Sequence, residues 1–412
     1  MYIKRSLEPV VLSISNQFKV LLLTGPRQVG KTTLLKQLME ASRQYVTLDD
    51  PPSRLLAQSD PQLFLERFPA PVLIDEIQYA PGLLPYIKME VDKSEARGQY
   101  WLAGSPTFHS MRHVSESLAG RVGILNLLGL SNREIDGGVS LPFKTDSETI
   151  MARTKDTTQL DLQTLYRRIH NGGMPELIAH PEIDRDVYFA SYINTYLVRD
   201  IRDLTQVADE TTFLRFLTIV AANTAKPVQY EDLARQTGIS APTAKKWLSV
   251  LVSSNLIALV QPYHHNLLKR TVKMPLLHFL DTGLCAYLTG WSDPIVLERG
   301  AMSGQFFESW AFSELYKSYL NAGLRSPFYY YRDKDKKEID LLIFENGTLY
   351  PIEIKKTASP GTNDMKNFAV LNPFKGIQNE SKVELGSGVV ICMIPEPMPV
   401  NKDNWFVPVR AI

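Results

Sequence analysis

The sequence predicts an α/β protein in four parts: a three-layer α/β domain, a helical region, a helix-turn-helix domain and a second α/β domain. Three observations predict it. A glycine-rich loop joins an apolar strand to a helix near residue 25, a helix-turn-helix pattern is centred near residue 238, and two apolar strands flank an Asn-Gly pair near residue 346. The expected parts are residues 1–135, 136–210, 211–275 and 276–412.

Composition limits the classes of protein to consider. The 412 residues are 44% hydrophobic and 22% charged, and the net charge is +1, so any nucleic-acid contact must use a local basic patch. Cys285 and Cys392 are far apart and lack metal-ligand spacing, which favours a reducing compartment. No apolar run approaches the ~20 residues that span a bilayer, and the first residues lack the apolar core of a secretory signal. We therefore expect a cytoplasmic protein with no membrane contact.

The glycine-rich loop predicts a nucleotide site. In the stretch LLLTGPRQVGKTTLLKQL, residues 21–38, backbone N–H groups of the loop can surround phosphates, Lys31 can reach the β- and γ-phosphates, and the Thr32 hydroxyl can bind magnesium. The following helix points the positive end of its dipole at the phosphates. We expect ATP and Mg²⁺ as cofactors. The predicted nucleotide-binding residues of the loop are Gly25, Pro26, Arg27, Gln28, Val29, Gly30, Lys31, Thr32 and Thr33.

A second acidic element supports this prediction. The apolar stretch PVLIDEIQ ends in Asp75 and Glu76. In phosphate-loop enzymes the first acid holds magnesium and the second orients the attacking water, so we assign these roles to Asp75 and Glu76. The alternative is a strand that ends in solvated acids, which the position of the stretch after a phosphate-binding loop disfavours.

Two further residues are candidates for the same site. The segment QYWLAGSP resembles the sensor strand of additional-strand ATPases, the AAA+ class, and this resemblance implies that Ser105 contacts the γ-phosphate or the attacking water. Arg121 follows a helix and could stabilise the transferring phosphoryl group from a neighbouring subunit, which requires a homo-oligomer. Arg112 is the weaker substitute. The alternatives are a serine at a strand-to-turn junction and a surface arginine.

The middle of the chain predicts helices followed by a winged helix. Residues 160–225 have helical periodicity, and the stretch YEDLARQTGISAPTAKKWLSVL then gives a helix, a turn at Gly238, an N-cap at Ser240 and a second helix. In winged helices the second helix often enters the DNA major groove, but the same fold also packs against proteins. The predicted nucleic-acid contacts are Lys245, Lys246, Lys269 and Arg270.

The Asn-Gly pair predicts a hairpin that gathers charged side chains. With a two-residue loop at 346 and 347, Asp340 lies directly opposite Glu353, where like charges are unfavourable unless a cation offsets them. The pleat places Lys355 on the same face as Glu353. Upstream, Glu308 lies within the apolar stripe of a predicted helix, and a buried carboxylate needs a partner.

An acid on a helix, an aspartate on one strand and Glu-x-Lys on the next resemble the core of the PD-(D/E)xK nuclease superfamily. The resemblance implies a restriction-endonuclease-like domain in which Asp340 and Glu353 bind magnesium, Glu308 assists, and Lys355 positions or activates water. Glu338-Ile339 stands where the superfamily has a proline–aspartate pair, which is a tolerated variation but makes the match less specific. The alternative is an exposed hairpin with a Glu353–Lys355 salt bridge.

From the phosphate-binding loop to the hairpin, the chain resembles a widespread bacterial and archaeal ATPase family that pairs an AAA+-type domain with a C-terminal region of unassigned function. The resemblance implies ATP binding and a nuclease-like tail. Two function classes remain. One is an ATPase that acts on DNA, with metal-dependent cleavage or grip at the hairpin. The other is a nucleotide-dependent switch whose C-terminal half binds a protein.

Overall fold

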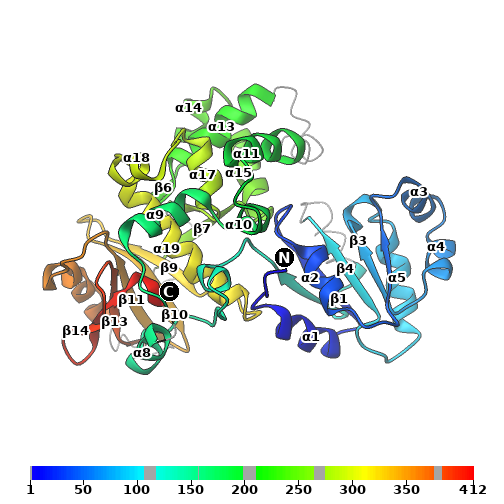
Figure 1. The fold of residues 1–412 in the computed structure, drawn as a ribbon, viewed down its shortest axis with the longest axis horizontal. Coiled ribbons are helices and arrows are strands. Elements are labelled where there is room, and N and C mark those ends of the chain that lie inside the picture. Colours follow the sequence, from blue (N-terminus) through cyan, green and yellow to red (C-terminus); the bar gives the residue numbers. More distant parts are fainter. Residues whose placement is uncertain (1, 106–116, 156, 198–209, 264–273, 375–382) are drawn as a thin grey trace.

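The computed structural model describes residues 2–105, 117–155, 157–197, 210–263, 274–374 and 383–412. Figure 1 shows the N-terminal α/β domain on one side, the C-terminal sheet on the other, and a group of helices beside both. Among the described residues, none of the helices has both the length and the apolar character needed to cross a membrane.

The N-terminal domain is a parallel sheet of five strands in the order β2-β3-β4-β1-β5. Strand β4 lies between β1 and β3. Helices α1 and α2 cover one face and α3, α4 and α5 cover the other, so the three-layer prediction is confirmed. The elements are α1 (Glu8–Gln17), β1 (Val20–Thr24), α2 (Lys31–Leu38), β2 (Gln44–Thr47), α3 (Pro51–Ser59), α4 (Pro61–Arg67), β3 (Val72–Asp75), η1 (Ile77–Tyr79), α5 (Leu83–Asp92), β4 (Tyr100–Gly104) and β5 (Val122–Asn126).

Helices follow, and those between residues 160 and 225 agree with the helical periodicity of the sequence. They are α7 (Asn132–Ile135), α8 (Ser147–Lys155), α9 (Leu162–Asn171), α10 (Pro175–Ala179), α11 (Arg185–Tyr192), the π-helix η2 (Ile193–Leu197) and α13 (Glu210–Ala222). Helix α8 packs on the C-terminal sheet, whereas α9 packs on the later helices α17 (Thr282–Leu288) and α18 (Pro294–Arg299). Residues 282–299 therefore belong spatially to the helical group, although the predicted C-terminal domain starts at residue 276.

The helix-turn-helix elements form as predicted. Helix α14 (Tyr230–Thr237) ends at Gly238 with φ +83°, and the Ser240 hydroxyl caps α15 (Ala241–Ser253) by accepting the Thr243 N–H at 3.2 Å. On α15, Trp247 packs edge-on against Phe213 and Phe216 of α13. Three antiparallel strands accompany these helices: β6 (Lys226–Pro227), β7 (Ile257–Pro262) and β8 (Leu276–Phe279). The assignment of a winged helix stays a prediction.

The C-terminal hairpin has the predicted register, because Glu345 pairs with Thr348 and Leu341 with Ile352. Helix α19 packs against the sheet face that carries Ile352 and Ile354. The elements are α19 (Ser303–Leu320), β9 (Phe328–Arg332), β10 (Glu338–Glu345), β11 (Thr348–Ile354), η3 (Thr362–Phe374), β12 (Glu384–Leu385), β13 (Gly388–Cys392), β14 (Met398–Pro399), β15 (Asn404–Pro408) and η4 (Val409–Ala411).

One pairing joins regions that the sequence analysis keeps apart. Strand β7 pairs in parallel with β9, with Gln261 beside Tyr329, so the strands of residues 226–279 and of the C-terminal region form one ten-stranded sheet. A parallel pair leaves no turn signal in the sequence, because its strands need a long crossover between them.

Candidate nucleotide site and acidic cluster

The phosphate-binding loop has a backbone that two of its glycines make possible. Gly25 has φ +147°, and a Cβ there would lie 1.9 Å from the carbonyl oxygen of Leu127. Gly30 has φ +89°, with open space where a Cβ would stand. The Lys31 Nζ donates hydrogen bonds to the carbonyl oxygens of Gly25 at 2.9 Å and Pro26 at 2.8 Å. The loop thus folds around its own lysine.

The two predicted magnesium ligands meet in the structure. Thr32, in the first turn of α2, donates its hydroxyl to Asp75 Oδ2 at 2.8 Å. Asp75 ends β3 and is buried, and Tyr45 donates to the same carboxylate oxygen at 3.3 Å. Oxygen ligands of this kind suit Mg²⁺, so Thr32 and Asp75 fit the role predicted for them.

Glu76 follows Asp75 in a left-handed backbone conformation, with φ +56°. Its carboxylate accepts a hydrogen bond from the Gln78 side chain. Burial raises the pKa of Glu76, although the Gln78 hydrogen bond and the Lys31 charge act in the opposite direction. A carboxylate with raised proton affinity beside the phosphate-binding loop is suited to orient water.

Ser105 directly follows β4, at the sheet edge that also carries the phosphate-binding loop. The residue is 8% exposed, and its Oγ has no hydrogen-bond partner among the described residues. Buried hydroxyls are normally paired, so this oxygen suits contact with a ligand. Residues 106–116, which contain Arg112, lie outside the described part of the chain.

A cavity of about 710 Å³ lies over the loop. Four of its lining residues were not predicted from the sequence: Asp49, Tyr79, Pro175 and Glu176. Pro175 and Glu176 come from α10, on the side of the helical group that faces the N-terminal domain (Figure 1). The Gly-Gly-Met-Pro-Glu stretch at residues 172–176 was the available signal. The lining residues are Arg27, Gln28, Gly30, Lys31, Thr32, Thr33, Asp49, Glu76, Tyr79, Pro175 and Glu176.

Arg121 lies away from this cavity. It immediately precedes β5, whereas the phosphate-binding loop follows β1, and parallel strands carry these positions at opposite edges of the sheet. Its guanidinium forms two hydrogen bonds with Asp92, at 2.6 and 2.9 Å. Within one protomer the structure therefore does not bring Arg121 to the nucleotide site.

The charged residues of the hairpin converge as the pleat predicts. The Lys355 Nζ lies 2.6 Å from Glu353 Oε2 and 3.0 Å from Asp340 Oδ2, and Asp340 also accepts the Ile354 N–H at 2.8 Å. Burial, and then the Asp340 charge, raise the pKa of Glu353 to about 9. The same two causes raise the pKa of Glu308 on α19 well above its usual range. We call Glu308, Asp340, Glu353 and Lys355 the acidic cluster.

Lys355 forms ion pairs with two of the carboxylates in the acidic cluster. Across the described ranges, no group of three or more His, Cys, Asp or Glu residues has an arrangement that could hold a metal ion. The ammonium group of Lys355 instead bridges two of the carboxylates. The magnesium-binding role of Asp340, Glu353 and Glu308 stays a prediction.

The predicted DNA-contacting residues are described only in part. Lys245 and Lys246 are exposed on α15, whereas Trp247 of the same helix is buried. Lys269 and Arg270 lie outside the described residues. Contact between this region and nucleic acid stays a prediction.

Comparisons with known proteins agree with the geometry of the loop. A family model described as an AAA domain matches residues 17–136. Residues 17–136 are an AAA-type ATPase domain. Two models for domains of unknown function, DUF8612 and DUF4143, match residues 162–295 and 303–412. The first of these matches ends within α18, and the second begins at Ser303, the first residue of α19.

The chain has curated relatives along most of its length. It is 29% identical over 357 residues to the uncharacterized protein Rv2008c of Mycobacterium tuberculosis, covering 86% of this chain and 74% of the relative. The uncharacterized protein Mb2031c of Mycobacterium bovis gives the same values. Among solved structures, the Walker-type ATPase paby2304 of Pyrococcus abyssi is 14% identical, with a TM-score of 0.45, over 70% of this chain and 96% of that chain. This structural similarity is too weak to support a statement about function.

Proposed function

We propose that the AAA domain binds ATP with Mg²⁺ and hydrolyses it. The observation that carries the proposal is the Thr32–Asp75 hydrogen bond beside Lys31, at a cavity of about 710 Å³. Bound Mg²⁺ would neutralise charge that develops on the phosphates. Lys31 would exchange the carbonyl oxygens of Gly25 and Pro26 for phosphate oxygens.

Glu76 acts on the attacking water, and Ser105 acts on the γ-phosphate or on the same water. Glu76 lines the cavity next to the magnesium ligand Asp75, so it orients the attacking water and accepts its proton. The Ser105 hydroxyl, buried at the end of the neighbouring strand, donates to the γ-phosphate or to that water. Both roles need a positioned nucleotide, which Lys31 and the loop N–H groups supply.

The test is nucleotide binding and turnover by the full chain. Lys31→Ala should reduce ATP hydrolysis by at least ~100-fold and weaken ATP binding, since a charge-assisted phosphate contact is lost. Glu76→Gln should reduce turnover by a similar factor while ATP still binds. The control is Lys93→Ala, because Lys93 pairs with Glu90 in an exposed salt bridge. ATP turnover that survives Lys31→Ala would refute the proposal.

A second candidate function is action on DNA, with ATP turnover moving the AAA domain relative to a DNA-bound C-terminal half. The convergence of Asp340, Glu353 and Lys355 from adjacent strands, with Glu308 opposite them, favours it. In this proposal the carboxylates bind Mg²⁺ after Lys355 moves aside to position water for phosphodiester cleavage. The alternative is a nucleotide-dependent switch that binds a protein with the same surface.

Action on DNA and the protein-binding switch predict different results when the protein is mixed with DNA. Linear, branched and single-stranded DNA are incubated with Mg²⁺ or Mn²⁺, with and without ATP. Cleavage by the wild type that disappears in Asp340→Ala and persists in Glu384→Ala, an exposed acid on β12 of the same sheet, supports the nuclease. DNA binding that falls steeply with salt but without cleavage supports a grip on DNA. Absence of both at low salt favours the switch.

A further inference from the structure

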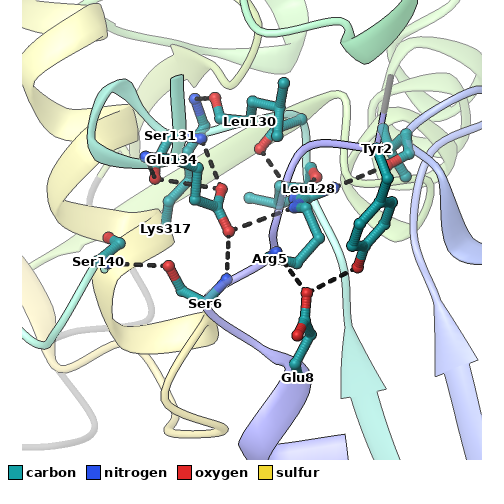
Figure 2. A network of polar contacts seen from close by, with 12 residues as sticks. Tyr2, Arg5, Ser6, Glu8, Leu128, Leu130, Ser131, Glu134, Ser140 and Lys317 are labelled. Atoms are coloured by element: carbon teal, nitrogen blue, oxygen red, sulfur yellow. Dashed lines mark hydrogen bonds and ion pairs between the residues drawn. The ribbon is translucent and has the colours of Figure 1, made fainter. Parts of the chain in front are cut away.

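The first residues of the chain form a polar network with residues 128–140 (Figure 2), and Arg5 of this network also contacts the phosphate-binding loop. Arg5 is 4% exposed. Its guanidinium donates to the carbonyl oxygens of Val29 at 2.9 Å and Leu128 at 2.7 Å, and to Glu134 Oε1 at 3.2 Å. Guanidinium donors lie in one rigid plane, so these three contacts fix the position of the Val29 carbonyl.

Glu134 holds Arg5 in that place. It is buried, and its oxygens accept the backbone N–H groups of Ser6 at 2.7 Å and Ser131 at 2.9 Å. Burial raises the pKa of Glu134, but the charge of Arg5 and these N–H groups outweigh burial and lower it, so the ion pair is charged. Glu8 accepts the Arg5 N–H at 2.9 Å and fixes the backbone on the other side (Figure 2).

The direction of the Val29 carbonyl decides the direction of the next N–H group. A trans peptide is planar, and its C=O and N–H point in opposite directions. The Val29 oxygen points to Arg5, so the Gly30 N–H points away from Arg5, and Gly30 lines the nucleotide cavity. If the peptide turned over, a carbonyl oxygen would face the phosphates, where it would repel them.

The Val29–Gly30 peptide needs such an anchor. Gly30 has no side chain, and the space where a Cβ would stand is open, so steric contacts oppose rotation of this peptide only weakly. We propose that Arg5 is a positioning residue of the nucleotide site, which holds the Val29 carbonyl outward so that the Gly30 N–H is available to the phosphates of a nucleotide. This inference rests on the proposed ATP binding. Arg5 acts through the Val29–Gly30 peptide and does not itself contact the ligand.

The structure offers a matched control for Arg5. Arg43 lies in the same domain, is 6% exposed, and also donates to backbone carbonyl oxygens, those of Gly98 at 2.9 Å and Gln99 at 3.4 Å, as well as to Glu40. It precedes β2, at the sheet edge opposite the phosphate-binding loop. Arg5→Met and Arg43→Met therefore remove similar buried contacts, but only the first faces the loop.

The experiment measures Kd for ATP, ADP and AMP by the full chain, with thermal unfolding alongside. Both variants should melt earlier than the wild type. In Arg5→Met the Kd should rise at least ~10-fold for ATP, less for ADP and least for AMP, because only phosphate contacts are lost. Arg5→Lys should lie between wild type and Arg5→Met, and it replaces Arg5→Met if that variant does not fold. Arg43→Met should leave all three constants unchanged.

The outcomes separate this inference from the function on which it rests. A wild type that binds no ATP refutes both. A wild type that binds ATP, with an unchanged Kd in Arg5→Met or Arg5→Lys, refutes the inference alone. Equal losses for ATP and AMP, or an equal loss in Arg43→Met, make Arg5 a structural residue and also refute it.

Discussion

The nucleotide site and the acidic cluster each hold a lysine beside the groups predicted to bind a ligand, but they are built differently. Lys31 contacts two carbonyl oxygens of its own loop, below a cavity of about 710 Å³. Lys355 contacts two carboxylates on neighbouring strands and neutralises part of their charge. A phosphate can displace Lys31 from neutral carbonyls more readily than a metal can displace Lys355 from two anions.

The same residue type is therefore available to a ligand in one place, where its partners are neutral, and neutralised by protein carboxylates in the other. The backbone of one short segment builds the first site. The second depends on side chains whose mutual repulsion already has a counter-ion. Four predictions test how far this difference holds.

The largest effect should come from the loop backbone. Gly25→Ala places a methyl group against the Leu127 carbonyl, and we expect a loss of about 3 kcal/mol or more in unfolding free energy and loss of ATP turnover. Gly30→Ala meets open space and has only its positive φ to oppose it, so about 1 kcal/mol is expected. Urea unfolding of both variants checks this. Equal losses would show that steric contact with Leu127 does not constrain the loop.

The second effect is a pH dependence of stability that ATP binding should not share. His278 of β8 is buried, stacks on Phe312 of α19, and burial lowers its pKa to about 3. Below pH 6.5 the unfolded chain binds a proton that the folded chain excludes. Stability should therefore fall by about 1.4 kcal/mol per pH unit from this residue, or about 2 kcal/mol at pH 5.

Urea unfolding at pH 7 and pH 5 measures this difference. His278→Gln should remove that part of the pH dependence, whereas His180→Gln, at a half-exposed position, should keep it. The described residues that line the nucleotide cavity include no histidine, so ATP binding should not follow the same profile. A pH dependence that is identical in the wild type and His278→Gln would contradict the prediction.

The third effect tests whether the acidic cluster accepts a metal. Lys355→Met leaves Asp340 and Glu353 without their shared cation, and since Lys355 is 37% exposed we expect a loss of only about 1 kcal/mol. Mn²⁺ should restore the melting temperature of this variant. Lys356→Met also removes an ion pair, with Glu298, but leaves no carboxylate pair for a metal to bridge. Melting curves with EDTA and with Mn²⁺ that coincide for Lys355→Met would argue against a metal site.

The smallest effect on stability should come from Arg121. Its pair with Asp92 is on the surface, so Arg121→Ala should not change the melting temperature measurably. Where the chain is monomeric, ATP turnover should also be unchanged. A role in a neighbouring subunit predicts a loss of turnover of at least ~10-fold only at concentrations where the wild type assembles. A loss that is independent of concentration would contradict that role.

The sequence predicts structure well where the signal is local. The phosphate-binding loop, the helix-turn-helix turn at Gly238 and the hairpin register all follow from short patterns with fixed backbone geometry. From the same register it follows that Asp340 and Glu353 meet. The order of the strands in the AAA domain was not predicted, because it depends on contacts between segments that are far apart in the chain.

Contacts between distant segments are the part that could not be predicted. The β7–β9 pair, the ion pair between Arg5 and Glu134, and the place of Glu176 at the nucleotide cavity each join residues far apart in the chain. The Gly-Gly-Met-Pro-Glu stretch marks a turn at Glu176, but no local pattern names the distant segment that each of these residues contacts. Arg5 stands in a charged N-terminal stretch that is indistinguishable from a solvated surface segment until the fold buries it.

Helix α19 sets a fixed spacing between the two sites compared here. Near its start it carries Glu308 of the acidic cluster. Further along, Lys317 donates to the Leu130 carbonyl at 3.0 Å and Glu314 accepts the Asn132 N–H at 2.6 Å, in the segment that Arg5 joins to the phosphate-binding loop. Glu308 and Lys317 are nine positions apart, which is ~14 Å along a helix.

A helix fixes the rotation of its two ends about the helix axis as well as the distance between them. One residue inserted between Glu308 and Glu314 would turn the two ends by about 100° relative to each other, so that only one end could keep its contacts. Seven inserted residues would restore the phase to within about 20°. Relatives that share both sites should therefore vary in length within the loops around α19, and leave the helix between these two positions uninterrupted.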